Sequence, residues 1–119
     1  MKDQESSQPF TGITLQAERR SHPRFALQLQ LELHEEGNDV PIRLTTTDLS
    51  RGGCYVQTSM PLAVGTRVYL RLWIGHTPLK IKGRIVTSHP QFGNGIMFIE
   101  YEGDAQKALS EYLDAVCFD

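Results

Sequence analysis

The sequence predicts a mainly β fold: about six short strands that form a small antiparallel barrel or sandwich, followed by a C-terminal α-helix. Three observations support this prediction. Several short segments alternate between apolar and polar residues with a period of two, which is typical of strands with one buried face. Clusters of turn-forming residues separate these segments at short intervals, as in small barrels and sandwiches. Near the C-terminus the apolar spacing changes to that of a helix.

The first two strands are predicted over residues 25–34 and 40–47. The first has a regular apolar face, formed by Phe25, Leu27, Leu29, Leu31 and Leu33. A turn at residues 36–39 separates the two strands. A dense cluster of turn-forming residues at 48–53 ends the second strand.

The other strands and the helix follow the same patterns. Strands are predicted over 54–58, 67–74, 79–85 and 96–101, with turns at 61–65, 75–78 and 93–95. Gly83 is the expected bulge or bend in its strand. The helix is predicted over 105–116 with Asp104 as its N-cap.

Length and composition indicate one domain without a membrane span. The chain has 119 residues, a usual size for a single domain, and no segment approaches the roughly 20 apolar residues of a transmembrane helix. Residues 1–18 are predicted to be a flexible polar tail ahead of a barrel domain at 19–119. Residues 1–8 lack the apolar region of a secretory signal, so a cytoplasmic location is expected. Cys54 and Cys117 are expected to be reduced and mostly buried, with a disulfide as the open alternative.

Enzyme signatures are not found in the sequence. It contains no Gly-x-Ser-x-Gly, no phosphate loop ending in Lys-Ser/Thr and no His-Glu-x-x-His. The four histidines are scattered without metal-ligand spacing. The sequence therefore predicts neither catalysis nor a metal or cofactor. The net charge of −2 means that the chain has no global basic field, which argues against a general nucleic-acid binder.

Two motifs are predicted to meet at one end of the sheet. The first is Arg20-x-x-x-Arg24, with Arg19 beside it, and the second is Asp48-x-Ser50-x-x-Gly53. Taken singly, the first could be a basic linker and the second an ordinary turn. The first motif precedes the first strand and the second follows the second strand. If these strands are antiparallel neighbours, the motifs lie side by side.

The pair of motifs, in this order, resembles the PilZ domain family over residues 18–117. Gly95, Ile96 and Phe98 in the last strand, and the C-terminal helix, are similar to that family as well. The resemblance implies a six-stranded antiparallel β-barrel of the split-barrel type with a C-terminal helix. It also implies binding of cyclic-di-GMP, a bacterial second messenger, and no catalysis. The ligand-binding residues that follow are Arg19, Arg20, Arg24, Asp48, Ser50, Gly52 and Gly53.

The chemistry of these residue types suits that ligand. An arginine guanidinium can bond guanine O6 and N7 in a bidentate manner or fork onto phosphate oxygens. Asp48 can accept from the N1 and N2 donors of guanine. Ser50 can bond the base or hold the turn, and Gly53 would let the backbone approach the ligand.

Some questions about ligand and partner stay open at this stage. The resemblance implies that the residue before the arginine pair influences whether one ligand or a stacked dimer binds, and arginine at Arg19 is compatible with the dimer. Arg51 either reaches the site or points to solvent. Ligand is expected to order the N-terminal segment, which then presents a surface to an unidentified downstream protein.

Two alternatives are kept. One is a ligand-independent protein-interaction module. The other is a small barrel that binds single-stranded nucleic acid, with rings supplied by Tyr55, Tyr69 and Trp73.

Overall fold

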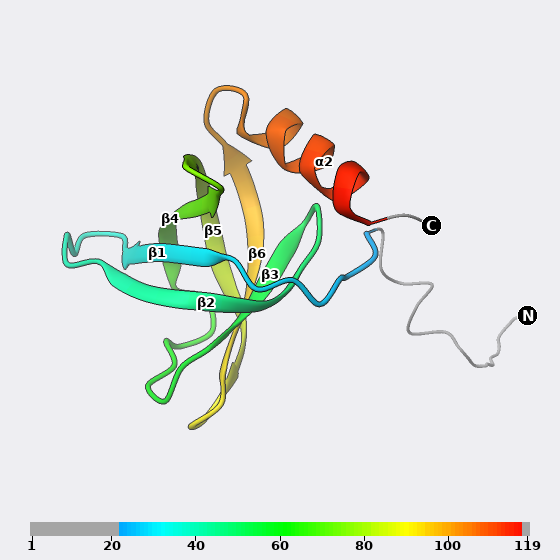
Figure 1. Ribbon diagram of the computed structural model, residues 1–119. Coiled ribbons are helices and arrows are strands. Elements are labelled where there is room, and N and C mark those ends of the chain that lie inside the picture. Colours follow the sequence, from blue (N-terminus) through cyan, green and yellow to red (C-terminus); the bar gives the residue numbers. More distant parts are fainter. Residues whose placement is uncertain (1–21, 118–119) are drawn as a thin grey trace, which may run out of the picture.

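The computed structural model describes residues 22–117, which form a closed antiparallel barrel and one helix (Figure 1). The strands are β1 (Gln30–Glu35), β2 (Ile42–Leu49), β3 (Gly53–Gln57), β4 (Arg67–Ile74), β5 (Thr77–His89) and β6 (Gly93–Tyr101), and the helix is α2 (Ala105–Val116). Their order around the barrel is β1-β2-β3-β6-β5-β4. The predicted fold class is confirmed. The predicted tail at 1–18 lies outside the described residues.

Alternate side chains of the strands fill the barrel, and α2 packs over one end of it (Figure 1). The helix buries its apolar stripe, formed by Ala105, Leu109 and Leu113, in the same core cluster. Asp104 precedes the helix as predicted, but its side chain makes no capping hydrogen bond. The helix is therefore held mainly by apolar packing and not by its cap.

The first strand begins at Gln30, later than the prediction of residue 25. The buried Thr46 side chain explains the difference. Thr46 N donates to Leu29 O at 2.9 Å as in a regular ladder. Leu29 N, however, donates to Thr46 Oγ1 at 2.8 Å, and this hydroxyl donates to Leu27 O at 2.7 Å, so the side chain interrupts the backbone ladder. The alternation over residues 25–29 thus belongs to an extended segment that packs along β2 and precedes β1.

The predicted turn at 93–95 is also wrong, because these residues begin β6 and pair with β3. Glycine is needed here because β6 lies close to β3: a Cβ on Gly93 would lie 2.1 Å from Val56 O. Asn94 is buried, and its side chain bonds the backbone N and O of Leu62. The predicted irregularity at Gly83 is confirmed by a register shift between Lys82 and Gly83.

Candidate functional site

The two motifs meet where β2 runs into β3. Arg24 Nη1 donates to Asp48 Oδ1 at 2.6 Å, and the two side chains are 30% and 33% exposed. The contact arises because β1 and β2 are antiparallel neighbours, as the sequence predicts. Arg24 engages one Asp48 oxygen, and both side chains remain accessible to a ligand.

A pair of backbone hydrogen bonds fixes the segment that carries Arg24. Phe25 N donates to Leu49 O and Leu49 N donates to Phe25 O, both at 2.9 Å. This Phe25–Leu49 bridge lies one residue away from both members of the ion pair. The position of Arg24 beside the turn is therefore set by the backbone as well as by the Arg24–Asp48 contact.

Ser50 shapes the turn at residues 48–53, called the ligand turn below. Its buried Oγ accepts from the backbone N–H groups of Gly52 and Gly53, both at 3.1 Å. Its backbone N–H donates to Gly53 O at 2.8 Å. Of the two roles considered for Ser50, this geometry supports holding the turn.

The two glycines of the ligand turn face different neighbours. A Cβ on Gly53 would lie 2.3 Å from the backbone oxygen of Ile96, so Gly53 is needed for the close packing of β3 on β6. A Cβ on Gly52 would instead lie 2.8 Å from Cδ2 of the His22 side chain. Gly52 is thus the glycine that leaves room for the segment preceding the barrel.

Arg51 connects the ligand turn to α2, so the interpretation that it reaches the site or points to solvent is wrong. Its Nε donates to Ser110 Oγ at 3.0 Å, and its guanidinium forms an ion pair with Asp114. The Tyr101 hydroxyl donates to the Arg51 carbonyl oxygen. The sequence did offer a signal, because Ser110 and Asp114 are four residues apart and share one polar helix face.

A buried thiol lies beneath the ion pair. Cys54 is completely buried, and this burial, together with the Asp48 carboxylate, raises the pKa of the thiol to about 12, while Arg24 acts in the opposite direction. Cys54 and Cys117 are both free, and Cys117 is partly exposed. The predicted burial holds for Cys54 but only in part for Cys117, and the reduced state of both thiols stays a prediction.

The structure places five of the seven predicted site residues. Arg24, Asp48, Ser50, Gly52 and Gly53 gather at the ligand turn, whereas Arg19 and Arg20 lie outside the described residues. Residues 22–117 bring no group of three His, Cys, Asp or Glu into position to hold a metal ion. In that same range, α2 does not have the length and apolar character needed to cross a membrane.

A family model described as the PilZ domain matches residues 18–115. The chain belongs to the PilZ domain family. PilZ domains are binding domains of a family known for cyclic-di-GMP receptors. No curated protein matches this sequence significantly.

Solved structures of other PilZ proteins share the fold. The PilZ domain of CeSA from a cellulose-synthesizing bacterium aligns with a TM-score of 0.62 and 23% identity, covering 79% of this chain and 97% of that one. The PilZ domain of YcgR from Escherichia coli, solved with c-di-GMP, gives 0.61 and 13%, covering 82% and 91%. PlzA from Borreliella burgdorferi, in complex with c-di-GMP, gives 0.61 and 18%, covering 84% of this chain and 43% of PlzA.

Proposed function

We propose that this PilZ domain is a receptor for cyclic-di-GMP that acts on a downstream protein without catalysing a reaction. The observation that carries the proposal is the Arg24–Asp48 contact at 2.6 Å, which unites the two motifs at the ligand turn. Two PilZ neighbours whose structures hold c-di-GMP support the choice of ligand. The predicted cytoplasmic location is part of the proposal.

The residues of the proposed site have different roles. Arg19, Arg20 and Arg24 bond guanine edges and phosphates, because guanidinium suits both planar acceptors. Asp48 accepts from the N1 and N2 donors of guanine through the oxygen that Arg24 leaves open. Ser50 and Gly53 keep the ligand turn in shape, and Gly52 leaves room beside His22. An additional cation at Arg19 would support a stacked ligand dimer.

Calorimetry with cyclic-di-GMP tests the receptor proposal. Arg20→Ala and Arg24→Ala should each weaken binding roughly hundredfold, because each removes charge-assisted hydrogen bonds. Arg43→Ala is the matched control: Arg43 is exposed, pairs with Glu32 on the barrel wall and should leave affinity unchanged. If the wild-type chain binds no cyclic-di-GMP at tens of micromolar, the receptor proposal is wrong and a ligand-independent interaction module takes its place.

The proposed output is a change in the segment preceding the barrel. Ligand contacts to Arg19 and Arg20 would fix that segment against the ligand turn and create a surface for the downstream protein. Hydrogen exchange of residues 1–24 should slow when cyclic-di-GMP is added. Equal exchange rates with and without ligand would remove this part of the proposal and leave the binding step intact.

A further inference from the structure

A second cationic region lies on the opposite side of the barrel from the ligand turn. The outward side chains of β4 are Arg67, Tyr69, Arg71 and Trp73, and those of β5 include Lys80, Lys82 and Arg84. These seven residues are called the basic face. It holds five of the twelve lysines and arginines of a chain whose net charge is −2. In the strand order, the β4–β5 pair is opposite the β2–β3 pair.

The register of β4 and β5 sets cations directly against each other. Arg67 pairs with Arg84, and Arg71 pairs with Lys80. Like charges at directly opposed positions destabilise a sheet. Within residues 22–117, Lys82 forms an ion pair with Glu100, while the other four cations of the basic face have no carboxylate partner. Stability of the barrel alone gives no reason for this arrangement.

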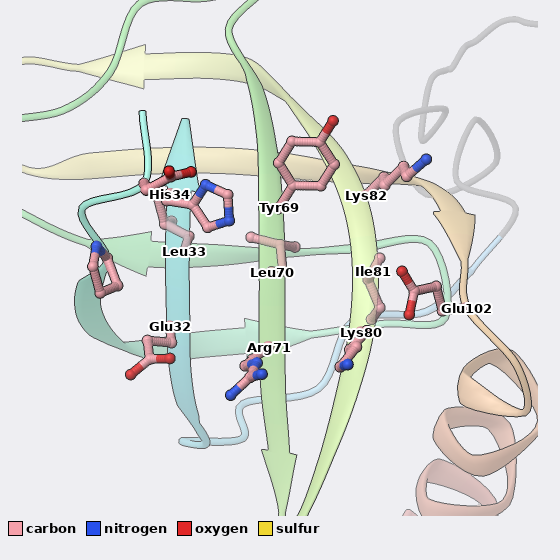
Figure 2. Close-up of a pocket in the computed structure, with 12 residues that line it drawn as sticks. Glu32, Leu33, His34, Tyr69, Leu70, Arg71, Lys80, Ile81, Lys82 and Glu102 are labelled. Atoms are coloured by element: carbon pink, nitrogen blue, oxygen red, sulfur yellow. The ribbon is translucent and has the colours of Figure 1, made fainter. Parts of the chain in front are cut away.

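The basic face also has the composition of a protein interface. Tryptophan, tyrosine and arginine are the residue types most enriched at binding hot spots, and they make up the whole outward face of β4. A groove of about 430 Å³ lies alongside, bordered by β1, β4 and β5 (Figure 2). Figure 2 shows Tyr69, Arg71, Lys80 and Lys82 grouped across β4 and β5, next to His34 of β1. Side chains of a partner could enter this groove.

The surroundings of the basic face favour an acidic protein segment over a uniform polyanion. Glu32 is paired in register with Arg71, Glu100 lies opposite Lys82, and Glu102 borders the groove. These carboxylates interrupt the cations, so the surface suits acidic residues spaced by neutral ones better than a continuous run of phosphates. The Tyr69 ring already stacks on His34 at 5.2 Å and lies under Lys82 Nζ at 5.9 Å, which leaves less of it for a nucleic-acid base.

We propose that the basic face is a docking surface for an acidic segment of a partner protein. Carboxylates of that segment pair with Arg67, Arg71, Lys80 and Arg84, and an apolar side chain packs on Trp73. Neighbouring exposed apolar side chains on β5 and β6, namely Val86, Met97 and Ile99, extend the contact area. The surface does not share residues with the cyclic-di-GMP site.

Nuclear magnetic resonance of the full chain tests this proposal with defined probes. The main probe is a twelve-residue peptide that alternates glutamate with serine and carries one central phenylalanine. We expect its addition to shift amide signals of β4 and β5 selectively. The Arg71→Glu/Lys80→Glu variant should weaken binding at least tenfold, and Arg71→Gln/Lys80→Gln, which avoids new carboxylates, about threefold. Lys107→Glu, an exposed cation on α2, is the matched control and should change affinity less than twofold.

Other outcomes would overturn the proposal. Tighter binding of an oligothymidylate with equal charge would make the basic face a nucleic-acid surface, and tighter binding of phosphatidylglycerol vesicles would make it a membrane surface. Shifts spread over the whole barrel, or an equal loss in the Lys107→Glu variant, would show non-specific attraction. Cyclic-di-GMP affinity should be the same in wild type and both double variants, so failure here is distinguishable from failure of the receptor proposal.

Discussion

Arg24 at the ligand turn contacts a carboxylate from the next strand, whereas Arg67 and Arg84 on the basic face stand opposite each other in register. The first arrangement neutralises charge and ties two chain segments together. The second concentrates charge on a regular, paired sheet without tying any segment. The two regions therefore differ in how their charges are paired. At the ligand turn an ion pair within the chain fixes the geometry, whereas on the basic face the charges stay available for another molecule.

The largest effect is expected where the ligand turn meets the barrel. Gly53→Ala should destabilise the fold by about 3 kcal/mol, because its Cβ would overlap a backbone oxygen of β6 that cannot move aside. Gly52→Ala, the adjacent control, should cost less than about 1 kcal/mol, because the His22 ring can rotate away. Urea unfolding measures both. Similar losses for the two variants would contradict the division of roles between these glycines.

The thiol beneath the ligand turn should make stability fall in alkali. The pKa of Cys54 rises from an ordinary 9.0 to about 12 in the folded chain, so the unfolded chain loses this proton first. Stability from this group is complete below pH 9 and is lost between pH 9 and 12, at roughly 1 kcal/mol per pH unit.

The measurement is urea unfolding at several pH values from 8 to 10.5. Cys54→Ala should flatten the decline, and Cys117→Ala should retain it. The Tyr101 hydroxyl, whose pKa burial also raises, contributes equally to all three chains. An unchanged slope in Cys54→Ala would show that the thiol is not the group responsible.

The smallest effect is expected on the basic face, where one charge reversal should stabilise the fold. Arg84→Glu creates an opposite-charge pair with Arg67 and should add about 0.5 kcal/mol. Lys82→Glu removes the ion pair with Glu100 and should lower stability by a similar amount. Thermal unfolding of both variants compares them. If Arg84→Glu is the less stable of the two, the like-charge pairs do not destabilise the barrel.

Periodicity and turn chemistry predicted a mainly β fold with a C-terminal helix and the meeting of the two motifs, while the choice of a barrel over a sandwich rested on the family resemblance. Both depend on local patterns and on antiparallel pairing of consecutive strands, which a sequence expresses directly. The assignment of residues 93–95 to a turn was wrong. Glycine is present at position 93 because the strand lies close to Val56, and the chain does not reverse there. The early start assigned to β1 was wrong because a single buried hydroxyl, that of Thr46, interrupts the backbone ladder ahead of Gln30.

The contact between Arg51 and α2 is harder to predict from the sequence than the meeting of the two motifs. It joins residues about sixty positions apart in the sequence, and its geometry depends on how the helix docks after the barrel has closed.

The basic face could be predicted from the sequence only in part. Alternation in β4 and β5 predicts which residues point outward, but the direct opposition of Arg71 and Lys80 follows from a register that only the structure gives.

The Phe25–Leu49 bridge has a consequence for the entropy of ligand binding. Arg24 and Asp48 are 24 residues apart, and closing a flexible loop of that length costs about 3 kcal/mol of chain entropy beyond a constant. Folding of the barrel already offsets this loss of entropy, because the bridge and the β1–β2 pairing close the loop before any ligand binds. In the proposed receptor, a messenger molecule would therefore meet Arg24 and Asp48 already placed side by side, without a further loss of chain entropy between them.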